Sequence, residues 1–519
     1  MKCDGARPYC GQCIRLNRID DCEYTDTQGR TRTQVLEERV ASLQARVDEL
    51  ENPQITSHSV LLQDPYSSSG PGTSGGVYGH SIDSSATYET VAQWWNLAEP
   101  PSSVIDILLG FFIPHARDIG FALSTNSIVS DFNLPSSSPL RPHPALFNVI
   151  ILWSLRLSKS YEFIQHEPIY LQRTTLSLLD ALHGGSSLAG FSVTRHRLQA
   201  VQVEILLTRY FFMLGRFIEG RYHLNAAVSL SISLGLHRLN IISSPLIGLS
   251  VSNIEAPNFA LSSVEDMSEL HERVLLFWSV LTMDRSWSSA LRMPGFLTEG
   301  EVPNSEIETP WALTIPNYVT RSPVTSDDGL STGTVRRFLS GEVPVGLSLS
   351  SQSLLAMGSL LFERAIRITN PSSPIEGNVQ VESQSLLNFL DRVYDTVPTL
   401  ETLSLEISDL DILQTNRELL TIHIYLNSSS IIALRVFNSE PEHPRFHIYM
   451  TRLLQALEEL ANSSPVAPDP IIGMICVEVA NYLLPEEVSR ARLQAALSRM
   501  SDECAFPIFV QQLEKFESY

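Results

Sequence analysis

The stretch LQAVQVEILLTRYFFML, residues 198–214, carries apolar side chains at the spacing of an α-helix rather than of a β-strand. Alternating apolar and polar residues are scarce, and no Asn-Gly or Asp-Gly pair has strand patterns on both sides. The helical spacing recurs in residues 104–113, 146–157, 226–236, 272–287, 354–368, 386–393, 419–437, 450–460 and 471–484. The sequence therefore predicts an all-α fold, with a large helical domain over residues 91–519.

A segment of different composition precedes this helical region. Residues 53–90 are rich in Ser, Gly and Pro, as in SSSGPGTSGG at 67–76, and cannot bury enough apolar area to offset the entropy of ordering the chain. We expect a flexible linker. It contains GTSGG at 72–76, which matches the pattern of a hydrolase nucleophile turn, but neither the strand nor the helix that such a turn requires flanks it.

Four of the six cysteines lie within the first 22 residues, as Cys3, Cys10, Cys13 and Cys22. Thiolates can bind Zn²⁺ at about 2.3 Å and fold a segment that is too short to have a core. The alternative is a disulfide framework, which needs an oxidising compartment, and the N-terminus has no apolar segment of the secretory kind. The pattern therefore favours a structural zinc site over residues 1–30.

Residues 31–52 form a short heptad pattern. Leu36, Val40, Leu43, Val47 and Leu50 recur at alternating steps of four and three, with valine at a and leucine at d, which favours a parallel two-stranded coiled coil. Arginines at g positions face glutamates at e positions of a partner helix. We expect this segment to dimerise the chain. A single amphipathic helix packed on its own domain is the alternative, because the pattern spans fewer than three heptads.

Two groups of motifs resemble one known family. The strings KCDGARPYCGQC at 2–13 and CEY at 22–24 resemble the second half of the fungal binuclear zinc-cluster DNA-binding domain. Further along, the chain resembles the middle homology region of the same transcription factors, over roughly residues 95–300. The strings that carry this second resemblance are HPAL at 143–146, GRYHLNAA at 220–227, LGLHR at 234–238, ER at 272–273, FWS at 277–279, MDR at 283–285 and MP at 293–294.

The resemblance implies how the cysteines act. In the family six cysteines hold two zinc ions; here Cys3, Cys10, Cys13 and Cys22 correspond to the third to sixth ligands, with Cys10 bridging. The first C-x2-C is absent, as are the basic residues of the DNA-contacting helix apart from Lys2. We therefore expect at most one zinc ion and weak DNA binding from the sequence as given. An incomplete gene model that starts at an internal methionine, or a true short isoform, would explain the missing half.

The resemblance also implies the function. It predicts a nuclear, sequence-specific RNA polymerase II transcription factor that binds promoter DNA at CGG-type half-sites and acts on the transcription machinery as a homodimer or heterodimer. The net charge of −21 is compatible with this function, because the zinc and coiled-coil segments carry many of the basic residues while the acid excess lies in the helical region. Two alternatives remain: a DNA-binding-deficient dimerising regulator and a metabolite-sensing helical protein.

The helical region offers few candidates for chemistry. No acid-base or nucleophile constellation has a supporting context, so no enzyme is predicted. No apolar run reaches the roughly 18 residues of a membrane span, and no membrane partner is expected. His223 and His237 lack partners at metal-ligand spacing. We expect Asp284 to fix packing, and a left-handed Gly235 to end a helix. Trp278 and Trp287 are predicted core residues.

Overall fold

The computed structural model divides the chain into two units, Met1–Ile82 and Asp83–Tyr519. The predicted coiled coil and linker lie outside the described residues, apart from Ala41. The structure describes residues 10–16, 41, 93–135, 138–183, 190–239, 261, 267–298, 305–314, 333–344, 348–369, 379–403, 409–437, 443–463, 467–482, 487–504 and 506–518.

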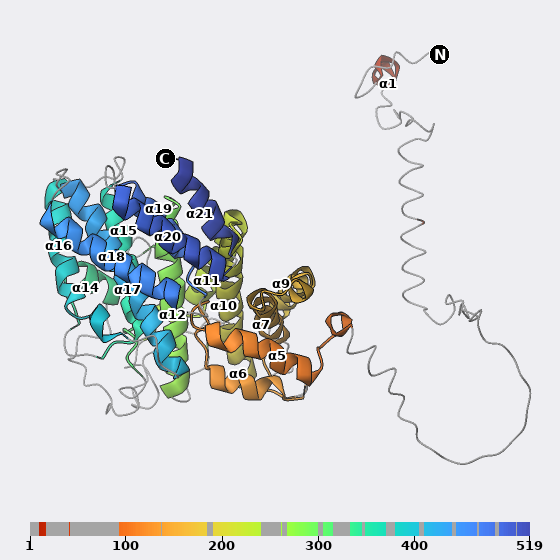
Figure 1. The fold of residues 1–519 in the computed structure, drawn as a ribbon. Coiled ribbons are helices and arrows are strands. Elements are labelled where there is room, and N and C mark those ends of the chain that lie inside the picture. The colour runs from red at the N-terminus through yellow and green to blue at the C-terminus, as the bar shows by residue number, and fades with distance from the viewer. Residues whose placement is uncertain are drawn as a thin grey trace, which may run out of the picture. The chain divides into compact units, whose positions relative to one another are not determined.

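The second unit is helical throughout its described part, which confirms the all-α prediction (Figure 1). An isolated antiparallel bridge between Leu313 and Leu349 is the sole extended pairing in that part. Its elements are η1 (Trp94–Asn96), α5 (Ser102–Phe112), η2 (Ile113–His115), α6 (Thr125–Phe132), α7 (Pro144–Leu157), α8 (Tyr161–Ile164), α9 (Glu167–His183), α10 (Gly190–Met213), α11 (Phe217–Ser233), η3 (Leu236–Arg238), α12 (Met267–Ala290), α14 (Thr334–Leu339), α15 (Ser351–Ile368), α16 (Val379–Tyr394), η6 (Leu400–Thr402), α17 (Leu410–Phe437), α18 (Pro444–Asn462), α19 (Ile471–Ala480), α20 (Glu487–Cys504) and α21 (Pro507–Ser518).

Helix α12 joins the two halves of this unit. It contacts α10 and α11 on one side and α15 and α19 on the other, and Figure 1 shows it between the N-terminal and C-terminal helices. Its side chains are buried around most of its circumference, as expected for a helix inside a core. Its polar side chains turn back on the helix: Thr282 and Ser286 each donate a hydrogen bond to the carbonyl four residues earlier. A single hydrophobic core therefore runs through both halves.

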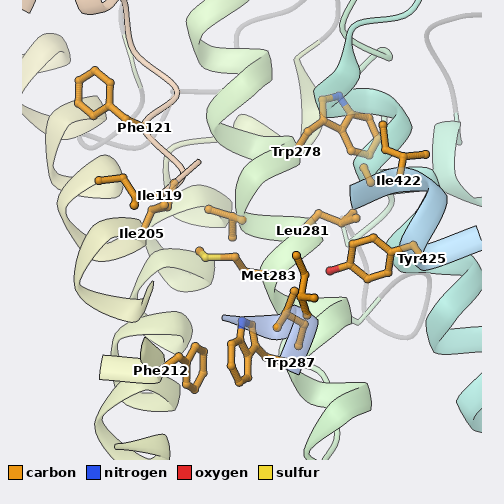
Figure 2. Close-up of a cluster of buried hydrophobic side chains, with 14 of the residues drawn as sticks. Ile119, Phe121, Ile205, Phe212, Trp278, Leu281, Met283, Trp287, Ile422 and Tyr425 are labelled. Atoms are coloured by element: carbon orange, nitrogen blue, oxygen red, sulfur yellow. The ribbon is translucent and has the colours of Figure 1, made fainter. Parts of the chain in front are cut away.

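The tryptophans of α12 anchor this core, as predicted (Figure 2). The Trp287 ring stacks on Phe212 of α10 at a centroid distance of 3.9 Å. Trp278 stacks on Trp311 at 4.2 Å and donates its indole N–H to the Pro310 carbonyl at 2.9 Å. Because both indoles are fully buried and the indole nitrogen of Trp278 has a partner, each fixes α12 against a different neighbour.

Helix α17 is long and apolar enough to cross a membrane by length and composition, contrary to the expectation that no segment reaches that length. Of its apolar window, 83% is buried inside the protein. It packs against α15, α16, α18 and α19. Ser429 and Ser430 each donate to the carbonyl one turn back, whereas the buried hydroxyl of Ser428 has no hydrogen-bond partner among the described residues. This burial is typical of the central helix of a helical domain.

Two motifs have the structural roles that were predicted. Gly235 follows α11 with a φ of 73°, the left-handed conformation that ends a helix. Asp284 is fully buried and accepts the backbone N–H groups of Phe296 and Leu297, at 2.8 and 3.0 Å. Asp284 thereby fastens the turn after α12 to the helix itself. Helix α12 begins five residues before the predicted range because its first turn is polar and carries no apolar signal.

Candidate functional site

The first unit contributes a short part of the predicted zinc module. Helix α1 (Gly11–Arg15) begins directly after the buried Cys10 and contains Cys13. The Cys13 backbone N–H donates to the Cys10 sulfur at 3.4 Å. A backbone donor on sulfur favours the thiolate form that binds metal, so this C-x2-C turn fits a zinc ligand pair.

The other predicted residues of this module lie outside the described part of the chain. These are Lys2, Cys3 and Cys22, together with Leu36, Val40, Leu43, Val47 and Leu50. Among described residues, no group of three or more His, Cys, Asp or Glu side chains is placed to hold a metal ion. The zinc site, the DNA contact and the dimer therefore remain predictions.

The second unit contains a cavity of about 750 Å³. It lies between the 117–125 segment, α12, the start of α15 and the start of α17. Phe121, Leu275, Leu313, Leu349 and Leu419 supply apolar wall, while serine and threonine hydroxyls supply hydrogen-bonding groups. Its size and mixed lining are typical of small-molecule sites. We call it the central cavity.

One wall of the central cavity is an ion-pair cluster. Arg117 pairs with Glu418 at 2.5 Å and also donates to the hydroxyls of Thr415 and Ser351, each at 3.1 Å. The Ser351 hydroxyl donates to the same carboxylate of Glu418. Burial alone would lower the pKa of Arg117, but the adjacent Glu418, helped by Asp411, raises it overall. The guanidinium therefore stays charged, and its hydrogen bonds join α15 to α17.

The opposite wall comes from the first turns of α12. The Glu272 carboxylate accepts the Ser124 backbone N–H at 3.0 Å and so holds the 117–125 segment against α12. Burial lowers the pKa of His271, and the charge of Arg117 lowers it further. The ring is therefore neutral near pH 7. The described lining residues include three carboxylates beside the guanidinium of Arg117, those of Glu272, Asp411 and Glu418.

Side chains of α10 and α17 hold the 117–125 segment, which lines the central cavity, in place. The Gln202 side chain donates to the Gly120 carbonyl at 3.0 Å and accepts the Ala122 N–H at 2.8 Å. Arg417 pairs with Asp118 at 3.0 Å and donates to the Ser463 carbonyl. Because these bonds fix both the backbone of the 117–125 segment and the carboxylate of Asp118, this wall of the cavity is pre-formed.

The histidines considered as metal ligands have structural partners. The His223 ring lies 2.6 Å from the Glu204 carboxylate and stacks on Phe211, between α10 and α11. The His237 carbonyl accepts two backbone N–H groups from residues 308 and 309. Both residues therefore connect elements within the fold.

Sequence reasoning did not find the central cavity. Of its lining residues, only Glu272 and Ser279 belong to motifs that were singled out. Arg117 and Glu418 are separated by 301 residues, so no local spacing could bring them to notice. Only the packing of α12 against α15 and α17 places them together.

Comparison with protein families identifies part of this unit. Residues 123–333 match the model described as the fungal specific transcription factor domain. The matched residues make up about two fifths of the chain. The matched range includes α12, one wall of the central cavity and the strings between residues 143 and 294 that resemble the middle homology region. Comparisons with curated proteins and with solved structures gave no match. The domain indicates a fungal transcription regulator with a nuclear role, of a regulatory rather than an enzymatic family.

Proposed function

We propose that the chain is a zinc-dependent, sequence-specific transcription factor that controls RNA polymerase II promoters. The observation that carries this proposal is the fungal specific transcription factor domain at residues 123–333, which follows a cysteine-rich segment and a heptad pattern. Nuclear localisation and contact with the transcription machinery follow from that activity. The DNA would be double-stranded promoter sequence with CGG-type half-sites, as the family resemblance implies.

Zinc would be held by Cys3, Cys10, Cys13 and Cys22. Four thiolates complete one tetrahedral site, and the metal would supply folding free energy to a segment without a core. The Cys13 N–H donated to the Cys10 sulfur supports this assignment. Without the first C-x2-C of the family, at most one ion is expected in the sequence as given.

Zinc counting tests this module. Native mass spectrometry of the full chain should find one zinc ion, and Cys13→Ser should lose it because three thiolates leave the tetrahedron open. Cys476→Ala is the matched control: Cys476 is a buried cysteine of α19, and it should retain the ion. Zinc retained by Cys13→Ser at wild-type affinity would contradict the assignment.

DNA binding and dimerisation are tested separately. Sedimentation should give a dimer, and Leu43→Asp should give a monomer because a buried carboxylate cannot be accommodated in a two-stranded seam. Gel shifts with CGG-containing duplexes should show binding that weakens with salt. A monomeric wild-type chain would remove the coiled coil from the account. A dimer that binds no duplex would favour the DNA-binding-deficient regulator.

The central cavity favours a sensing role within this function. Its volume suits a small molecule, and its excess of carboxylates over guanidinium favours a neutral or cationic ligand with an apolar body. Because its walls come from both halves of the unit, a bound ligand would tie these halves together. We propose that such a ligand modulates transcription through the helical domain.

A cavity-filling variant tests this role. Leu419→Trp should lower the affinity of the neutral dye Nile red by at least about tenfold, because the indole occupies the cavity. Ile107→Trp, on an exposed position of α5, should leave binding unchanged. Equal binding by wild type and Leu419→Trp would exclude the central cavity as the binding site.

A further inference from the structure

A second cavity, of about 560 Å³, lies at the N-terminal end of α7. It shares no lining residue with the central cavity. Its walls come from residues 98–99, residues 138–148, α9 and α10. Two arginines, two histidines and one carboxylate line it, those of Arg141, Arg173, His143, His196 and Glu99. We call it the α7 cavity.

Arg173 brings an unneutralised charge to the α7 cavity. Its guanidinium lies over the ring of Tyr170, 5.0 Å from the centroid. Arg173 makes no salt bridge within the described residues, and its hydrogen-bonding neighbour there is the hydroxyl of Tyr170. Burial raises the pKa of Tyr170 to about 12 against the opposing charge of Arg173, so the phenol stays neutral. The guanidinium therefore lines the cavity without a carboxylate partner among the described residues, and an anion in the cavity would supply one.

The remaining charges leave the cavity positive. Arg141 pairs with the half-exposed Glu99 at 2.6 Å and donates to the Leu134 carbonyl at 2.5 Å. That pair is neutral in sum, and Arg173 adds one positive charge. No other carboxylate belongs to the described lining residues; the carboxylate of Asp180, on α9, also acts on His143, but it is exposed and screened by solvent. An anion entering the cavity therefore meets a net attraction.

The two histidines supply neutral polar groups. Their rings lie 4.9 Å apart at an angle of 65°. Burial lowers the pKa of His143 to about 4, with His196 adding to the effect, and burial also lowers the pKa of His196. The Nδ1 of His143 accepts the Ala145 N–H at 3.2 Å. Since the neutral ring then carries its proton on Nε2, His143 retains one hydrogen-bond donor.

We propose that the α7 cavity binds a small organic carboxylate. A guanidinium offers two parallel N–H donors that match the two oxygens of a carboxylate. The cavity also presents Phe147, Leu176 and prolines, which suit an apolar body rather than an inorganic ion. This proposal does not depend on the proposed transcriptional function. It gives the HPAL string at 143–146 a role in the wall of a ligand site.

Isothermal titration of the full-length chain with benzoate tests the proposal. Benzoate should bind saturably, while benzamide, which has the same ring without the charge, should give no saturable heat at constant ionic strength. Arg173→Gln should weaken benzoate binding by about tenfold or more, the loss expected for one charge-assisted contact. Arg173→Lys keeps the charge without the fork and should weaken it less.

Two further variants separate the site from general effects. Arg216→Gln removes an exposed guanidinium that precedes α11 and pairs with Glu219 at the surface. This variant should bind benzoate like wild type. Leu176→Trp keeps every charge of the α7 cavity. Because Leu176 is 64% exposed at the cavity rim, this substitution should leave folding intact while the indole obstructs entry of the ligand. It should weaken binding even if Arg173→Gln fails to fold. Benzoate that does not bind, or that binds Leu176→Trp and a folded Arg173→Gln as it binds wild type, would overturn the proposal.

Discussion

The carboxylate of Asp284 gives the most quantitative test of the fold. Asp284 is fully buried in α12, and its two oxygens accept the N–H groups of Phe296 and Leu297. Asp284→Ala leaves both donors without an acceptor, that of Leu297 buried and that of Phe296 half-buried. Each orphaned donor costs roughly 1–3 kcal/mol, so the pair should lower the free energy of unfolding by about 4 kcal/mol. Asp284→Asn keeps one acceptor oxygen and should cost about 2 kcal/mol.

Urea denaturation followed by tryptophan fluorescence measures this series. Trp287 lies one turn from Asp284 and stacks on Phe212, so its emission reports the region directly. Asp106→Ala, at an exposed position of α5, is the control and should change the free energy of unfolding by less than about 0.5 kcal/mol. A destabilisation of Asp284→Ala no larger than that of the control would refute the reasoning. So would equal losses for the Ala and Asn variants, because the second acceptor would then contribute nothing.

Two further predictions concern pH and backbone conformation. Burial lowers the pKa of His143 to about 4, so between pH 6.5 and 4 the native state binds fewer protons than the unfolded chain and stability falls as the pH is lowered. In urea titrations at several pH values, His143→Gln should reduce this loss of stability by about 2 kcal/mol, whereas the exposed control His447→Gln should not. Equal dependence of stability on pH in His143→Gln and wild type would contradict the linkage. Gly120 has a φ of +85°, and an added Cβ would lie 2.6 Å from Arg209 Nε, so Gly120→Ala should lower the thermal midpoint and cost more than about 2 kcal/mol. Gly110→Ala, in the open interior of α5, should instead stabilise by about 0.5–1 kcal/mol; destabilisation there, or tolerance of Gly120→Ala, would contradict the geometry.

The apolar spacing was sufficient to predict the fold class. The 198–214 stretch falls almost entirely within α10, and the predicted tryptophans are core residues. Boundaries were less predictable where a helix begins with polar residues. Helix α17 starts at Leu410, nine residues before its apolar run, because its first two turns are largely polar and leave no apolar signal. Helix α14 lies outside every range of helical spacing that the sequence shows.

The candidate sites needed the three-dimensional arrangement. Arg117 and Glu418 meet across 301 residues, and neither lies in a motif. In the sequence Arg173 is one more cation on an amphipathic helix, and only the structure shows that it lines a cavity without a salt bridge among the described residues. The cysteine motif, in contrast, could be recognised from the sequence, because the spacing of metal ligands is local. Sequence therefore predicts sites built from one segment better than sites built from several.

Chromatin immunoprecipitation of the natural gene product, compared with its Cys13→Ser variant, tests the central claim most directly. A zinc-dependent transcription factor should occupy a discrete set of promoters that share CGG triplets, and occupancy should collapse in Cys13→Ser because the metal module cannot close. The Cys476→Ala protein should keep the wild-type pattern. Promoter occupancy that is absent from the wild type, or unchanged in Cys13→Ser, would contradict the account.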